Sequence, residues 1–182
     1  MSFIKQDYIF IHIPKTGGVS IKNTLNGAMQ SGHETLYEIK TVGKDFFGTK
    51  YFPTQRVITC CRDPLTRFVS AFYYCQVMHK NQISLPKTIH QLIEEFPYRT
   101  DVKGWVHFRP MIEFIWSPKS VKVELIRFEN FDEDFYSIFG QKIGKNNETN
   151  YKSPKFTTTE KDIIKDAYNQ DYKYFKYGDY QI

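Results

Sequence analysis

The chain has 182 residues, of which 41% are hydrophobic, and its 25 Lys and Arg against 20 Asp and Glu give a formal net charge of +5. This size and composition predict one soluble globular domain over residues 1–182. The basic residues are scattered without a block of like charge, which argues against a nucleic-acid partner, and no apolar run approaches the roughly 20 residues that span a bilayer.

The amino terminus and the cysteines indicate the compartment. The apolar stretch Tyr8–Ile13 is short and runs straight into Pro14, so it does not resemble a secretory signal. Three cysteines, of which Cys60 and Cys61 are adjacent, form neither a disulfide framework nor a zinc pattern. We therefore expect a cytoplasmic protein with reduced core thiols and no metal.

Two strand–turn–helix units open the chain. Tyr8–Ile13 is almost continuously apolar, which is typical of a strand covered on both faces, and a helix is predicted from about Ser20 to Met29. The layout recurs at the strand Val57–Cys61, where Asp63 suits a helix N-cap and Pro64 the first helical position. Apolar residues recur on one face of this second helix: Leu65, Phe68, Phe72, Cys75 and Met78.

The rest of the chain continues the alternation. A helix is predicted over Thr88–Phe96, a strand over Val121–Arg127 and a helix capped by Asn130 over Phe131–Phe139. Thr159 followed by Asp162 resembles a capping box that opens a last helix. Strands alternating with helices predict an α/β fold with a mainly parallel central sheet flanked by helices in three layers, and the ligand site of such a fold lies where strands end and helices begin.

The first strand leads into the segment Pro14–Ser20. Its glycines, Gly17 and Gly18, allow the backbone to approach an anion closely, Lys15 adds a cation, and the hydroxyls of Thr16 and Ser20 can reach phosphate oxygens. The segment is P-loop-like, but Lys15 precedes the glycines and no G-x-x-x-x-G-K-[ST] run exists. Taken alone, it is equally typical of an ordinary polar turn.

The second strand leads into RDPLTRFVSAFY, residues 62–73. Arg62 stands at the strand end and offers a planar fork for a second phosphate, and the hydroxyl of Ser70 could complete that site. From its chemistry alone, Ser70 could equally be a surface serine. Arg67 is interpreted as a solvated helix charge.

Together, PKTGGVS and RDPLTRFVSAFY resemble the donor-binding signatures of the sulfotransferases that use PAPS (3′-phosphoadenosine 5′-phosphosulfate). HFRP at 107–110, IRFENFDEDF at 126–135 and YKYFKYG at 172–178 resemble the carbohydrate, membrane-type branch of that family. The resemblance implies that Lys15 contacts the bridging oxygen between phosphate and sulfate and that Thr16, Gly17, Gly18, Val19 and Ser20 wrap the 5′ end. It further implies that Arg62 and Ser70 bind the 3′-phosphate.

The same resemblance implies a general base and an acceptor site. His33 is the candidate base because it occupies a position similar to that of a family histidine, and Glu34 is the alternative. His107 and Arg109 lie in a segment similar to one near the family's acceptor site. Of the other histidines, His12 is expected in the sheet, and His79 and His90 on helix surfaces.

A polar stretch over residues 141–156 is predicted to be a long loop. The family resemblance implies that it closes over the nucleotide, with Lys152 or Ser153 near the 3′-phosphate and Tyr151 or Phe156 near the adenine. Closure would exclude water from a labile donor.

The sequence thus predicts a PAPS-dependent O-sulfotransferase whose product is 3′,5′-adenosine bisphosphate. The acceptor is a hydroxyl, which the family branch suggests belongs to a carbohydrate, although glycolipid, small-molecule and peptide acceptors stay open. Two alternatives remain: a P-loop kinase or nucleotide hydrolase, and a non-catalytic nucleotide-binding module.

Overall fold

The computed structural model describes residues 2–25, 32–44, 49–144 and 154–178. The chain divides into two compact units, each built from two separate segments. The first unit combines Met1–Arg62 with Met111–Glu148, and the second combines Asp63–Pro110 with Thr149–Ile182. The expectation of one domain over 1–182 stays a prediction.

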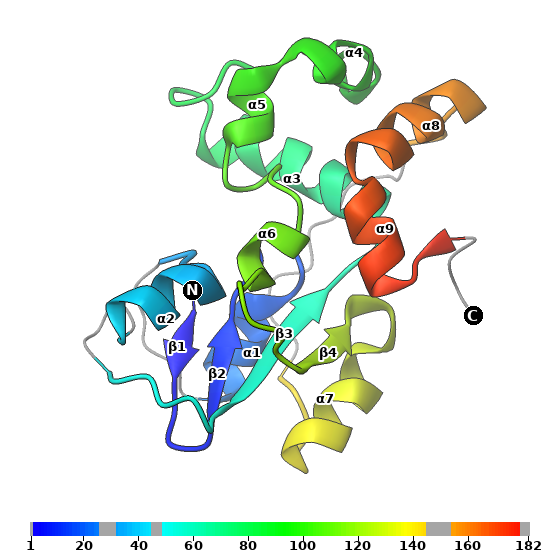
Figure 1. The fold of residues 1–182 in the computed structure, drawn as a ribbon. Coiled ribbons are helices and arrows are strands. Elements are labelled where there is room, and N and C mark those ends of the chain that lie inside the picture. Colours follow the sequence, from blue (N-terminus) through cyan, green and yellow to red (C-terminus); the bar gives the residue numbers. More distant parts are fainter. Residues whose placement is uncertain (1, 26–31, 45–48, 145–153, 179–182) are drawn as a thin grey trace. The chain divides into compact units, whose positions relative to one another are not determined.

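The first unit contains a four-stranded sheet in the order β1-β2-β3-β4 (Figure 1). β1 pairs antiparallel with β2, whereas β2 with β3 and β3 with β4 are parallel. The bounds are Phe3–Ile4 for β1, Tyr8–Ile11 for β2, Arg56–Cys61 for β3 and Val123–Arg127 for β4. The predicted α/β class with a mainly parallel sheet is confirmed, and β1 is a strand that the sequence did not reveal.

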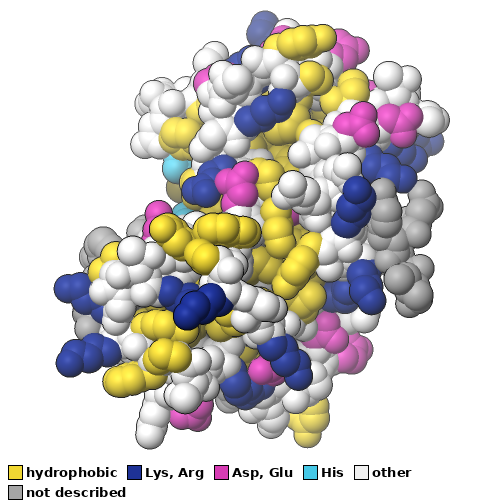
Figure 2. Space-filling model, in the orientation of Figure 1, with side chains coloured by type: hydrophobic (Ala, Val, Ile, Leu, Met, Phe, Trp, Pro, Cys, Tyr) yellow, Lys and Arg dark blue, Asp and Glu magenta, His cyan; other side chains and the backbone are white. Residues whose placement is uncertain are grey.

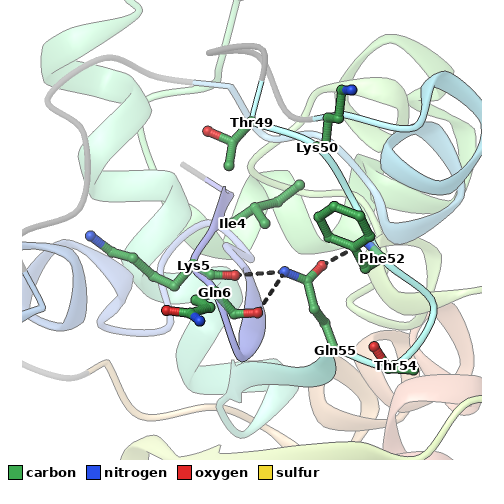
Figure 3. Close-up of a pocket in the computed structure, with 8 residues that line it drawn as sticks. All are labelled: Ile4, Lys5, Gln6, Thr49, Lys50, Phe52, Thr54 and Gln55. Carbon is green, nitrogen blue, oxygen red and sulfur yellow. Dashed lines mark hydrogen bonds between the residues drawn. The ribbon is translucent and has the colours of Figure 1, made fainter.

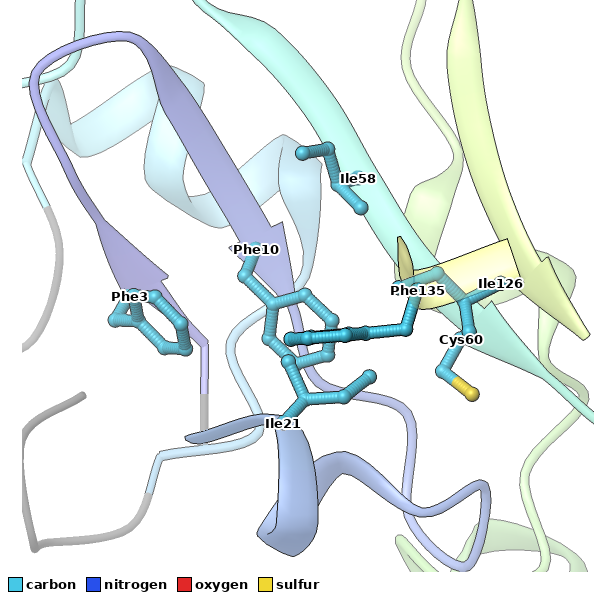
Figure 4. Close-up of a cluster of buried hydrophobic side chains, with 7 residues drawn as sticks. All are labelled: Phe3, Phe10, Ile21, Ile58, Cys60, Ile126 and Phe135. Carbon is cyan, nitrogen blue, oxygen red and sulfur yellow. The ribbon is translucent and has the colours of Figure 1, made fainter. Parts of the chain in front are cut away.

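One face of this sheet carries a buried apolar cluster. Ile21 of α1 (Gly18–Thr24) and Phe135 of α7 (Phe131–Phe139) pack against alternate residues of the strands (Figure 4). Each strand turns every second side chain to this face, so the helix after β2 and the helix after β4 cover it together. The cluster consists of Phe3, Phe10, Ile21, Ile58, Cys60, Ile126 and Phe135.

Two further α-helices belong to the first unit. Thr35 and Glu38 form a capping box at the start of α2 (Leu36–Val42), which satisfies backbone N–H groups that have no partner inside the helix. α2 contacts α6 (Ile112–Ile115), and both bury apolar residues. A 3₁₀ turn over Phe128–Asn130 joins β4 to α7.

The second unit is helical. It contains α3 (Pro64–Met78), α4 (Ile89–Glu95), a 3₁₀ turn (Phe96–Tyr98), α5 (Thr100–Gly104), α8 (Thr158–Ala167) and α9 (Asn169–Phe175). The ring of Phe68 lies 5.0 Å from that of Phe96 and 5.3 Å from that of Phe108, and the Tyr168 hydroxyl donates to the Phe108 carbonyl at 2.6 Å. These aromatic contacts join α3, the segment after α5 and the end of α8 into one core.

The helix starts show where local sequence rules held. Asp63 caps α3 through the Thr66 amide, as predicted, whereas Asn130 precedes α7 without a side-chain cap. The predicted capping box of Thr159 and Asp162 is wrong, because Thr157 and Glu160 form it and begin α8 two residues earlier. Met78 is also misplaced: it is exposed where α3 ends.

Within the ranges described above, no helix combines the length and apolarity needed to cross a bilayer.

Candidate functional site

The loop between β2 and α1 is anchored to the strands on both sides. Thr16 is fully buried, and its hydroxyl donates to the Ile13 carbonyl at 2.9 Å. The Thr16 carbonyl accepts from the Cys60 thiol of β3 at 2.6 Å. The hydroxyl proton of Thr16, which the sequence assigned to a phosphate, is therefore used to hold the loop itself.

Cys60 donates this hydrogen bond as a neutral thiol. Complete burial raises its pKa well above the usual value, and the charge of the neighbouring Cys61 as a thiolate raises it further. Cys60, Cys61 and Cys75 are all buried and free of disulfides. The proton that Cys60 donates to Thr16 is thus retained across the physiological pH range.

Both glycines of the loop are required by close neighbours. Gly17 has a φ of 89°, and a Cβ there would lie 2.9 Å from Cζ of Phe131. A Cβ on Gly18 would lie 2.5 Å from Nε2 of His12 and 3.0 Å from its Cγ. Only a residue without a side chain fits at these two positions, so the backbone of the loop is packed closely against α7 and against the end of β2.

Lys15 has a left-handed backbone with a φ of 67°. For a residue with a side chain this conformation costs about 1–2 kcal/mol, so the surrounding contacts must enforce it. Among the residues that the structure describes, the only other non-glycine residue with a positive φ is Lys176, at the end of α9. Backbone strain of this sort is concentrated at functional sites, which favours a role for the loop in binding.

Arg62 follows β3 directly and lies beside the loop. Its Nη1 donates to the Lys15 carbonyl at 3.4 Å, and its guanidinium carbon lies 4.2 Å from the centre of the Phe128 ring. β2 and β3 are parallel neighbours, so their carboxyl ends reach the same edge of the sheet. This edge therefore carries two cationic residues from segments 47 positions apart.

His33 belongs to the same unit and precedes α2. Its Nδ1 lies 3.4 Å from the His12 carbonyl oxygen, and the rings of the two histidines are 4.8 Å apart. The His12 ring, which is buried, in turn borders Gly18. The structure thus connects His33 to the loop through His12, and it buries Ser20 on α1, where the Ser20 amide donates to the Gly17 carbonyl at 3.0 Å.

Val19, also in the first unit, lies on α1 and is partly exposed. Ser70, His107 and Arg109 belong to the second unit. Ser70 is buried on α3, so its interpretation as a surface serine is excluded. His107 is buried with its ring 4.9 Å from that of Tyr74 and 5.0 Å from that of His79, and Arg109 is partly exposed. Lys152 and Ser153, together with Tyr151, lie outside the described residues, and Phe156 packs its ring 5.7 Å from that of His90.

Two charged or polar helix residues differ from their sequence interpretation. Arg67 is only 1% exposed, and its Nη2 donates to the His107 carbonyl at 3.3 Å, so it is not a solvated charge. It is one of the buried residues of α3, as Phe68 and Ser70 are. His79 is partly buried and pairs Nδ1 with Gln82 at 2.7 Å, whereas His90 is half exposed beside Glu160.

A cavity of about 500 Å³ lies elsewhere in the first unit (Figure 3). Gln55 lines the cavity and joins the segments around it by hydrogen bonds. Its side-chain amide donates to the carbonyls of Lys5 at 2.6 Å and Gln6 at 3.2 Å, and its side-chain oxygen accepts from the Phe52 amide at 2.9 Å. Lys5 and Gln6 precede β2, and Gln55 precedes β3, so the cavity is at the amino ends of these strands. Among the residues that the structure describes, no predicted donor-binding residue lines it.

Basic charge is not concentrated on the face drawn in Figure 2, where Lys and Arg side chains are interspersed with Asp, Glu and uncharged groups. Scattered charge of this kind gives little long-range attraction to a polyanion, so binding of an anion has to be local.

Comparison with protein-family models, with curated proteins and with solved structures finds no significant match for this chain. The functional inference therefore depends on the residues and their geometry.

Proposed function

We propose that this protein is a PAPS-dependent O-sulfotransferase with a P-loop-like donor site at the carboxyl ends of β2 and β3. The observation that carries the proposal is the position of Arg62 beside Lys15, with 3.4 Å between Nη1 of Arg62 and the Lys15 carbonyl. Two cations that follow neighbouring parallel strands can hold an anion with two phosphorylated ends. The close packing of Gly17 against Phe131 and of Gly18 against His12 fixes the backbone of the loop that we propose to bind one of those ends.

The proposed chemistry is a direct transfer. The acceptor oxygen bonds to sulfur while the bond from sulfur to the bridging phosphate oxygen breaks, and 3′,5′-adenosine bisphosphate leaves. Lys15 neutralises charge on the leaving oxygen, and His33 takes the proton of the acceptor hydroxyl. By analogy with phosphoryl transfer, positioning and charge neutralisation supply most of the rate, so no metal is invoked.

The other residues have supporting roles in this proposal. Thr16, Val19 and Ser20 shape the loop around the 5′ end, and Arg62 binds the 3′-phosphate. The assignments of Ser70, Lys152 and Ser153 to the 3′-phosphate and of His107 and Arg109 to the acceptor stay predictions from the sequence. We propose that the acceptor is a sugar hydroxyl. The three free cysteines favour a reducing compartment, in agreement with a cytoplasmic location.

Nucleotide binding is the first test. Titration calorimetry should give a micromolar dissociation constant for 3′,5′-adenosine bisphosphate, about 8 kcal/mol of binding free energy, and much weaker binding of adenosine 5′-phosphate, which lacks the 3′ group. Magnesium-dependent ATP turnover in place of this binding would support a kinase or hydrolase. Equal affinity for the two adenosine nucleotides would refute the two-ended site.

Transfer is the second test. Wild-type protein with sulfur-labelled PAPS and a panel of sugar acceptors should yield a labelled product, and Lys15→Ala should abolish it while leaving the melting temperature unchanged. Lys44→Ala is the matched control, because Lys44 is an exposed lysine outside the loop. Nucleotide binding without transfer to any acceptor would identify a binding module instead of an enzyme.

A further inference from the structure

Ser2 is a buried serine that holds the segment carrying His33. It is only 1% exposed. Its amide donates to the Gly32 carbonyl at 3.1 Å, and its hydroxyl donates to the Glu34 carbonyl at 2.8 Å. Residues on both sides of His33 are therefore bonded to the same serine, which restricts the backbone of the histidine between them.

The same hydroxyl also fixes the end of β2. Ser2 Oγ accepts from the His12 amide at 3.0 Å. The His12 carbonyl, on the other side of that residue, lies 3.4 Å from Nδ1 of His33. Ser2 thus fixes the positions of both partners of this contact, which are His12 with its carbonyl and the segment that carries the His33 imidazole.

A backbone carbonyl can only accept a hydrogen bond, so the imidazole nitrogen that faces it must carry the proton. A neutral imidazole carries one N–H. When Nδ1 holds that proton against the His12 carbonyl, Nε2 is left with the lone pair, which is the form that a general base requires. The contact therefore selects which nitrogen of His33 can act as a base.

We propose that Ser2 is a positioning residue for His33, which keeps the imidazole in the tautomer protonated on Nδ1 so that Nε2 accepts the proton of the acceptor hydroxyl. This role rests on the proposed function, with His33 as its base. The transferred proton ends on Nε2, and the imidazolium is stabilised by the Nδ1–H bond to His12. The His12 ring, packed between His33 and Gly18, ties the same arrangement to the donor loop.

The tautomer can be measured without turnover. Nitrogen chemical shifts of the five histidine side chains, recorded at alkaline pH where imidazoles are neutral, distinguish the two tautomers. The His33 signal is identified by its loss in His33→Asn. Wild-type His33 should be protonated on Nδ1, and a wild-type His33 protonated on Nε2 would overturn the proposal whether or not any variant folds.

The variant Ser2→Ala tests whether Ser2 determines the tautomer of His33. It should shift His33 toward the tautomer protonated on Nε2 and lower kcat by about tenfold or more, part of the hundredfold or greater effect of a general base, with the KM for PAPS unchanged. Ser137→Ala, at an exposed serine of α7, should change neither. If the Ser2→Ala protein still binds adenosine bisphosphate and its His33 tautomer is unchanged, only the role of Ser2 is refuted. If the wild-type protein fails to bind this nucleotide, the proposed function itself is refuted.

Discussion

Replacing Gly18 by alanine should distort the loop between β2 and α1. The new Cβ would lie 2.5 Å from Nε2 of His12 and 3.0 Å from its Cγ, whereas non-bonded heavy atoms are at rest about 3.5–4.0 Å apart. Because Cδ2 of His12 would lie closer still, the imidazole or the start of α1 must move by more than about 1 Å. His12 cannot turn away freely, because it is 5% exposed and its ring packs against His33.

Overpacking of this size costs about 1–3 kcal/mol of the free energy of unfolding. Gly18→Ala should lower the urea midpoint accordingly and weaken the binding of 3′,5′-adenosine bisphosphate, which calorimetry measures on the folded protein. Gly104→Ala is the matched control, because a Cβ at this position of α5 meets nothing within 4 Å.

Comparing Gly18→Ala with Gly104→Ala shows whether the loop is closely packed against His12. If Gly18→Ala is as stable as Gly104→Ala and binds the nucleotide with wild-type affinity, then the loop does not need close approach to His12. The steric argument for both the glycine and the donor site would then fail.

Three further predictions concern single side chains. Arg62→Lys loses the planar fork and should weaken binding of adenosine bisphosphate about tenfold in calorimetry, or 1.4 kcal/mol; unchanged affinity would contradict a phosphate role. Arg67→Ala removes a buried guanidinium and should cost about 2 kcal/mol or more in urea unfolding, where a solvated arginine would cost under about 0.5 kcal/mol. Burial raises the pKa of Glu160, but hydrogen bonds from Thr157 and His90 outweigh it and hold the pKa below its usual value. This carboxylate therefore adds stability above about pH 4.3 that is lost as the pH falls through the folded pKa, so Glu160→Gln should lower the melting temperature at neutral pH and not in strong acid.

Much of the first unit could be predicted from sequence because its signals are local. Continuous apolar runs marked β2 and β3, and Asp63 with Pro64 marked the start of α3. The register of parallel strands then brings Lys15 and Arg62 to one edge of the sheet, which follows from topology alone. These are the parts of the site that residue type and order are sufficient to place.

Other features depended on tertiary contacts that no local pattern encodes. β1 has two residues and is held by pairing with β2, so it leaves no periodicity in the sequence. Arg67 has the spacing of a surface charge, yet the fold buries it and gives its guanidinium a hydrogen-bond acceptor in the carbonyl of His107, 40 positions away. Ser2 was missed for the same reason, since its partners at Gly32 and Glu34 are brought near only by the fold.

The stacking of Arg62 on Phe128 bears on the thermodynamics of binding. A long arginine side chain loses up to about 2 kcal/mol of rotational freedom when it is immobilised. Since the guanidinium rests 4.2 Å from the ring centre before any ligand arrives, much of that loss is incurred during folding and not on binding. Removing the ring by Phe128→Ala should therefore make the entropy of anion binding less favourable even though Arg62 itself is unchanged.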